Sequence, residues 1–274
     1  QHLRLGTMGM VLPLYSPWRV VEEVAMLDHL TEGRLEIGCA NGVPQELKRI
    51  GIDSEEARDR FNESLEILDA ALIKPVISHH GKYWNFDDLA ILPRPRQQPS
   101  PPKWTTVVSK KSAKKTAERN SKICTGFQSV ELITEIFDVY RNEADRNQFV
   151  AGPDHIGLRR NVSVAEDESE AKEGARVALE ATLKLVADDP RVGIDATSII
   201  DNPTGGSGFS LHEDEFISGT PDQVAEQIIV QCRACGAGHF LATIGRASRL
   251  RRAKLISMFG KEVVPKLRQA DIIQ

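Results

Sequence analysis

The sequence is poor in cysteine and has no long apolar run. Four cysteines scattered over 274 residues are too few for a disulfide framework, which favours a reducing, cytoplasmic location. No apolar stretch approaches the roughly 20 residues that a membrane-spanning helix needs, and the first residues do not resemble a signal peptide. We therefore expect a cytoplasmic protein without a membrane partner.

A surplus of basic residues is missing too. The chain carries 35 Lys and Arg residues against 39 Asp and Glu residues, a formal net charge of −4, which argues against a nucleic-acid partner. With 41% hydrophobic residues, the chain has enough apolar side chains to bury a large core.

Metal-ligating patterns are also sparse. Cys232 and Cys235 form a lone CxxC pair, and two further ligands at the spacing of a zinc site do not accompany it. His79 and His80 lie in a polar segment and belong to no such pattern. We therefore expect no metal site and assign the cysteine pair to packing at a helix end.

What the chain does have is a regular alternation between strand-like apolar runs and helix-like spacing. Strands are predicted at 3–12, 34–39, 103–108, 122–127, 155–164 and 239–245. Helices are predicted at 17–30, 54–72, 109–120, 130–147, 168–187, 220–236 and 247–267. Six strand–helix units with one extra helix indicate an α/β protein whose parallel sheet is covered by helices. An open doubly wound sheet and a (β/α)8 barrel both fit this pattern.

Residues 188–219 lose this periodicity and include the stretch "NPTGGSGFS". A loop of this length suits either a mobile lid over a substrate site or a solvated insertion. Thr220 and Gln223 follow it with the spacing of a capping box, and the helix that they start is predicted to end at Gly236.

The stretch "RLEIGCANG", residues 34–42, ends a predicted strand in small and turn-prone residues. Glycine at the carboxyl end of a strand lets a backbone or a flat ligand approach closely. Ligands bind at that end of the strands in α/β proteins. A tight turn between strand and helix explains the same residues, so the pattern alone leaves both interpretations open.

A second strand end, "TTVVSKKSAKK", places Ser109 and Ser112 where a helix begins. Free backbone N–H groups and the helix dipole favour an anion there. Nearby lysines would add positive potential: Lys110, Lys111, Lys114 and Lys115. The alternative is an ordinary serine N-cap ahead of a solvated lysine face.

The run "LRLGTMGMVLPLYSPWRVVEEVAMLDHLTEGRLEIGCANG" resembles the luciferase-like monooxygenase family. The later segments "HGKYWNF", "PRPRQQPSPP", "VVSKKSA" and "ISGTPDQVAEQI" follow in the family's order. The resemblance implies a TIM (β/α)8-type barrel, with residues 1–274 as a single domain. It further implies that the chain represents strands three to eight and lacks the first two βα units. Those units would carry active-site residues, among them a histidine, so no catalytic residue is named.

The resemblance also implies a flavin site. It places Met8 and Gly9 at a non-prolyl cis peptide under the flavin, and it places Ala40 and Asn41 beside the cofactor at the end of the next strand. Ser109 and Ser112 would bind the phosphate, and the backbone at Val108 would lie near the flavin ring. Arg246 would face the phosphate or the surface.

The family's chemistry implies a monooxygenase in which reduced FMN, delivered by a separate flavin reductase, reacts with O2 to oxygenate a small organic substrate. One alternative is an F420-dependent oxidoreductase that transfers hydride on the same fold. Another is a flavin-binding paralogue or subunit that has no catalytic activity. A homodimer is the expected assembly.

Overall fold

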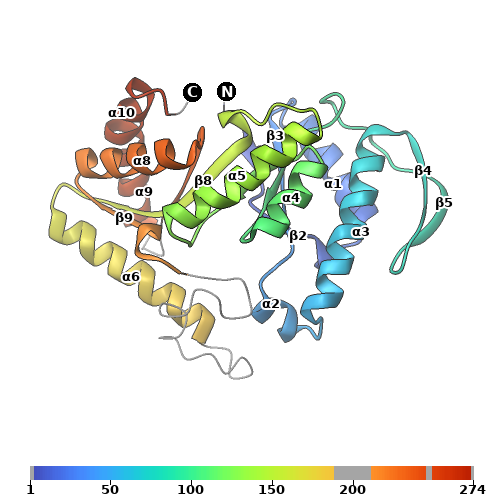
Figure 1. Ribbon diagram of the computed structural model, residues 1–274, viewed down its shortest axis with the longest axis horizontal. Coiled ribbons are helices and arrows are strands. Elements are labelled where there is room, and N and C mark those ends of the chain that lie inside the picture. The colour runs from blue at the N-terminus through green and yellow to red at the C-terminus, as the bar shows by residue number, and fades with distance from the viewer. Residues whose placement is uncertain (1–2, 188–210, 245–248, 273–274) are drawn as a thin grey trace. The chain divides into compact units, whose positions relative to one another are not determined.

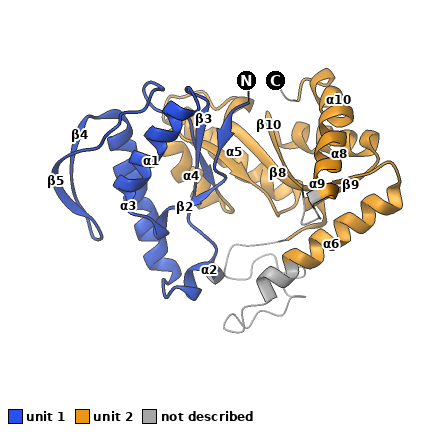
Figure 2. Ribbon diagram, turned by 180° about the vertical axis from the view of Figure 1, so that it is seen from behind, with its two compact units in different colours: residues 1–106 blue, residues 107–274 orange. Residues whose placement is uncertain are grey.

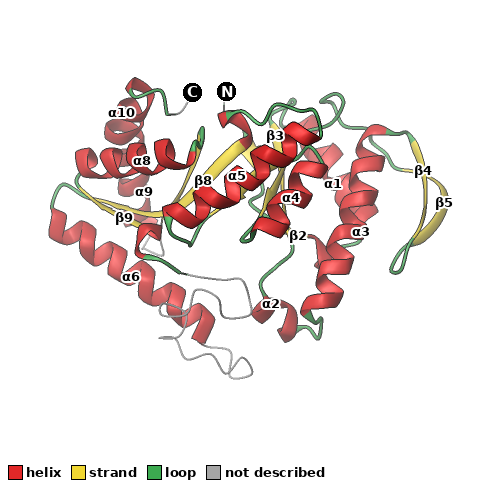
Figure 3. Cartoon of the chain, viewed as in Figure 1, coloured by secondary structure: helices red, strands yellow, loops and turns green. Residues whose placement is uncertain are grey.

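The computed structural model describes residues 3–187, 211–244 and 249–272. The chain forms two compact units, residues 1–106 (unit 1) and 107–274 (unit 2), which Figure 2 distinguishes by colour. Strands and helices alternate in both units (Figure 3).

The strands of unit 1 form a small parallel sheet. The two short strands β1 (Leu5–Gly6) and β2 (Met10–Val11) both pair with β3 (Leu35–Ala40), which also pairs with β6 (Lys103–Thr106). The single strand predicted at 3–12 is therefore interrupted. The interruption contains a cis peptide bond between Met8 and Gly9, as the family resemblance implied.

Three helices accompany this sheet: α1 (Pro17–Leu30), α2 (Pro44–Arg49) and α3 (Ser54–Ile73). Val21 of α1 and Leu68 of α3 pack with Ile37 of β3 in one apolar cluster. The helical spacing of the apolar residues therefore produces the buried faces that it predicts. The side chain of Asp53 caps α3 by accepting hydrogen bonds from two N–H groups of its first turn.

The polar segment after α3, for which the sequence predicted no element, forms an antiparallel hairpin. It consists of β4 (Val76–His80) and β5 (Asn85–Ala90), which lie beside α3 in Figure 1. The buried carboxylate of Glu63 on α3 accepts hydrogen bonds from the backbone N–H groups of Lys82, Tyr83 and Trp84. This tertiary contact fixes the turn, which explains why local sequence did not predict it.

In unit 2, the parallel strands are centred on β8 (Ile156–Val164). The strands that pair with β8 are β7 (Lys122–Thr125), β9 (Phe216–Gly219) and β10 (His239–Ile244). Strand β9 and the 3-10 turn before it, η3 (Glu213–Glu215), correct the prediction of an irregular loop that continues to residue 219. Four residues are too few to show a periodicity. Residues 188–210, the main part of the predicted lid, lie outside the described residues.

Helices α4 (Lys110–Glu118), α5 (Val130–Arg146), α6 (Glu168–Ala187) and α8 (Pro221–Cys235) belong to unit 2. Phe137 and Tyr140 of α5 pack with Ile156 and Leu158 of β8 in the core. The predicted capping box at the start of α8 is confirmed, and Gly236 ends the helix at φ 69°.

The last predicted helix is not uniform. It consists of α9 (Arg249–Met258), a π-helical turn η4 (Phe259–Val263) and α10 (Val264–Gln269), which contains Pro265 near its start. Proline has no N–H to continue the α-helical ladder, which accounts for the change of helix type before it. Among the described helices, none combines the length and the apolar composition needed to cross a membrane.

Replacing Glu63 with alanine tests whether its carboxylate stabilises the turn of the hairpin. The backbone N–H groups of the turn would lose their buried acceptor, so we expect the free energy of unfolding to fall by about 3 kcal/mol. Urea unfolding measures this change. Glu66→Ala, on the exposed side of the same helix, should change it by about 0.5 kcal/mol or less. Equal effects of the two substitutions would contradict the proposed role of Glu63 in stabilising the turn.

Candidate functional site

In unit 1, the predicted cofactor residues lie together at the carboxyl end of β3. Strand β2 pairs with this end, with Val11 opposite Ala40. A Cβ atom built on Gly9 would lie 3.2 Å from the Cβ atom of Ala40. Met8 is 41% exposed, so the cis peptide is partly accessible from outside unit 1. Gly9 and Ala40 are therefore close neighbours, and Met8 directly precedes Gly9.

Gly38 has an explanation within the chain itself. A Cβ atom at this position would collide with the carbonyl oxygen of Thr7. The hydroxyl of Thr7 donates to the Gly38 carbonyl over 3.0 Å and accepts from the Gly38 N–H over 3.1 Å. The close approach of residues 7–9 to β3 therefore requires a glycine here, whether or not a ligand binds.

Asn41 differs from these residues because its side chain offers an unused acceptor. Its Oδ1 atom is buried, and it has no hydrogen-bond partner among the described residues. Buried side-chain oxygens are normally paired. An orphaned acceptor at a strand end fits a site that receives a donor group from a ligand.

In unit 2, the predicted phosphate residues lie at the first turn of α4. Ser109 is the N-cap, and its hydroxyl oxygen accepts from the Ser112 N–H over 3.3 Å. The two hydroxyl oxygens are 3.0 Å apart. Val108 directly precedes them, so these three predicted residues also lie together. The arrangement presents hydroxyl groups and helix N–H groups at a helix N-terminus.

The lysines of α4 contribute less positive potential than their number suggests. Lys110 Nζ lies 2.7 Å from a carboxylate oxygen of Glu135, and Lys114 Nζ lies 3.8 Å from one of Glu143. Both acids belong to α5. Lys110 and Lys114 are thus paired with acids, and this turn also carries the two serine hydroxyls and the backbone N–H groups of a helix N-terminus.

A buried charged cluster in unit 2 was not predicted. Glu215 is fully buried, forms ion pairs with Arg159 and Arg160, and accepts from the Asn161 amide over 2.8 Å. Burial lowers the pKa of Arg160, and the charge of Glu215 acts in the opposite direction. The sequence signal for this cluster was a pair of adjacent arginines in a mostly apolar strand. Buried charges need partners, so such a pair indicates a buried acid nearby.

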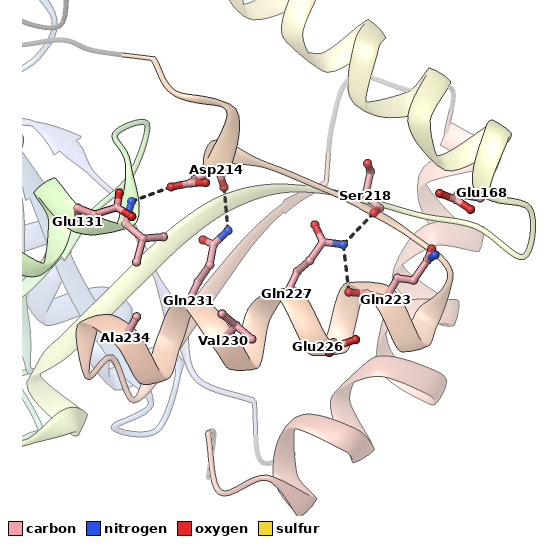
Figure 4. Close-up of a pocket in the computed structure, with 11 residues that line it drawn as sticks. Glu131, Glu168, Asp214, Ser218, Gln223, Glu226, Gln227, Val230, Gln231 and Ala234 are labelled. Atoms are coloured by element: carbon pink, nitrogen blue, oxygen red, sulfur yellow. Dashed lines mark hydrogen bonds between the residues drawn. The ribbon is translucent and has the colours of Figure 1, made fainter.

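Figure 4 shows a cavity of about 570 Å³ in unit 2 that runs along α8. Gln227 and Gln231 line it and donate to the carbonyl groups of Ser218 and Asp214. Its other polar lining residues include acids: Glu131, Glu168, Asp214 and Glu226. The cavity contains none of the predicted cofactor residues, and its negative charge disfavours a phosphate. Arg246 lies outside the described residues.

Parallel strands connected by helices define an α/β protein. The family model of the luciferase-like monooxygenases matches residues 1–238. The chain belongs to this family. The fold predicted from the resemblance is thereby confirmed.

Several relatives are similar over much of the chain. An uncharacterized protein y4wF of Sinorhizobium fredii is 29% identical over 253 residues, which cover 89% of this chain and 71% of the relative. The oxygenase component of a flavin-dependent trigonelline monooxygenase from Acinetobacter baylyi is 29% identical over 64% of this chain and 49% of its own length. An FMNH2-dependent dimethylsulfone monooxygenase of Pseudomonas putida is 24% identical over 98% of this chain and 76% of the relative.

Solved structures share the fold. Monooxygenase RslO1 from Streptomyces bottropensis superposes with a TM-score of 0.80 at 22% identity, covering 96% of this chain and 78% of that one. An F420-dependent tetrahydromethanopterin reductase from Methanopyrus kandleri gives a TM-score of 0.73 at 17% identity, covering 96% and 82%.

We expect the cysteine thiols to be unreactive in the folded protein. All four are buried, and burial raises the pKa of the Cys39 thiol to about 12. Near pH 8, the thiol stays protonated, and only the thiolate is a nucleophile. We therefore expect iodoacetamide to label the cysteines only as the chain unfolds in urea, measured by mass spectrometry. Rapid labelling of Cys39 in the native protein would contradict this.

Proposed function

We propose that the chain is the oxygenase of a flavin-dependent monooxygenase that uses reduced FMN and O2 to oxygenate a small organic substrate. Its family supports an oxidoreductase, and the trigonelline and dimethylsulfone relatives support the flavin. Within the chain, the proposal rests on the hydroxyl pair of Ser109 and Ser112 at the first turn of α4.

The residues of unit 2 fit the phosphate of FMN. Ser109 and Ser112 would donate their hydroxyl protons to phosphate oxygens, alongside the free N–H groups of α4. Hydrogen bonds to a charged oxygen are stronger than those between neutral groups. This turn would therefore fix the position of the cofactor.

The residues of unit 1 fit a flat polar ligand. The buried Oδ1 of Asn41 would accept a hydrogen bond from an N–H or O–H group of the flavin. Met8, Gly9 and Ala40 would provide an apolar surface that excludes water from the reacting atoms. The chemistry supplied by bound reduced FMN is the delivery of electrons to O2.

A separate flavin reductase would supply the reduced FMN, which the description of the trigonelline relative as an oxygenase component supports. We also propose a homodimer. Light scattering on the purified chain tests the assembly, and O2 uptake that depends on an added reductase tests the supply of electrons.

F420-dependent hydride transfer is the second candidate. The likeness of the fold to the tetrahydromethanopterin reductase favours it, since that protein is F420-dependent. Anaerobic fluorescence titration of the chain with reduced FMN and with reduced F420 separates the two. Tighter binding of reduced FMN supports the monooxygenase, and tighter binding of F420 supports hydride transfer.

The double substitution Ser109→Ala and Ser112→Ala should weaken FMN binding about tenfold or more, because the phosphate loses two hydroxyl donors. Riboflavin, which has no phosphate, should bind as tightly to the variant as to the wild type. Isothermal titration measures both affinities. Thr220→Ala removes another helix N-cap, so it should cost stability of about 1 kcal/mol but leave FMN affinity unchanged. Equal FMN affinity in the double variant would refute the phosphate assignment.

A further inference from the structure

Gln128 is a buried residue in the loop between β7 and α5. Its side chain is 4% exposed, and its Nε2 atom donates to the carbonyl of Val108 over 2.9 Å. A carbonyl oxygen can only accept a hydrogen bond, so the amide nitrogen must face Val108. This bond therefore determines which way the amide points.

The other end of the amide is unsatisfied. The Oε1 atom of Gln128 is buried, and none of the described residues donates a hydrogen bond to it. Leaving a buried acceptor unpaired is unfavourable by an amount comparable to a lost hydrogen bond. Apolar packing alone would be served by a residue such as methionine or leucine. The amide oxygen is thus suited to a donor that comes from outside the described chain.

The place of this oxygen connects it with the cofactor residues of unit 2. Val108, to which Gln128 is bonded, directly precedes the N-cap Ser109. The carbonyl of the neighbouring Val107 is held by the Thr125 hydroxyl over 2.6 Å. The backbone before α4 is therefore fixed from the β7 side at two successive carbonyl groups, one of them by Gln128.

We propose that Gln128 is a cofactor-binding residue whose Oε1 accepts a hydrogen bond from an N–H or O–H group of the bound flavin. The inference rests on the proposed function. Flavins carry such donors on the ring and on the ribityl chain. Through its amide nitrogen, Gln128 also positions Val108, so one side chain would hold both the ligand and the backbone that faces it.

Gln128→Met tests the inference, because methionine has a similar size and shape but neither accepts strongly nor donates. We expect the dissociation constant for FMN to rise about tenfold, and that for riboflavin to rise by a similar factor, because the phosphate is not involved. Anaerobic titration with reduced FMN should show the same loss. Gln128→Leu provides a second variant with the same expectation, should the first not fold.

Thermal unfolding separates a ligand contact from a structural role. Without flavin, the variant loses the hydrogen bond to Val108 but also loses an unpaired buried acceptor, so its unfolding temperature should change by only a few degrees. With saturating FMN, the wild type should gain more stability than the variant. A purely structural role predicts a lower midpoint without flavin and an unchanged affinity for FMN.

Ser64→Ala is the matched control. Ser64 of α3 also has a buried side-chain oxygen without a partner among the described residues, but it belongs to the core-facing side of a helix in unit 1. FMN affinity should not change. If the wild type binds FMN and Gln128→Met binds it within twofold, the inference fails while the proposed function stands. If the wild type binds neither FMN nor reduced FMN, both fail.

Discussion

The buried carboxylate of Glu215 organises the loops of unit 2. Besides its ion pairs with Arg159 and Arg160, it accepts a hydrogen bond from the backbone N–H of Phe127 over 2.7 Å. A carboxylate without water is tolerated only where such partners surround it. Phe127 has φ 73°, and its ring lies under the Arg159 guanidinium. Since Gln128 follows directly, the position of its amide against Val108, and with it the start of α4, depends on this cluster.

In unit 1, two buried carboxylates likewise accept hydrogen bonds from irregular segments. Asp28 of α1 is fully buried and accepts from both the backbone and the side-chain amide of Gln97, each over 2.7 Å. Gln97 lies in the proline-rich connector that leads into β6, so this irregular segment is anchored to a helix. Glu63 anchors the β4–β5 hairpin in the same way. In each case one buried acid provides the acceptors that an irregular segment cannot provide for itself.

The parts of the fold that sequence predicted are those set by neighbouring residues. The capping box of Thr220 and Gln223, the left-handed Gly236 and the hydroxyl pair of Ser109 and Ser112 depend on spacings of a few positions. The hairpin was not predicted because a distant acid, Glu63, holds its turn, and β9 was not predicted because four residues are too few to show a periodicity. Gln128 was not predicted as a site residue for a related reason. A glutamine in a loop attracts no notice in the sequence, and only the fold buries its Oε1 and lets its Nε2 donate to the Val108 carbonyl.

Small residues at a strand end are weaker evidence for a ligand than partnerless polar atoms are. Gly38 suggested a close approach, and the chain itself makes that approach through Thr7. A glycine allows a close approach because it has no Cβ atom. It does not tell whether the approaching group is a ligand or another part of the backbone. An orphaned acceptor such as Asn41 Oδ1 or Gln128 Oε1 is different, because folding has left it unsatisfied and only a donor can relieve that. These oxygens and the serine hydroxyls are therefore the groups that favour a cofactor site, and the glycines explain only how the backbone comes close enough to form the strand ends.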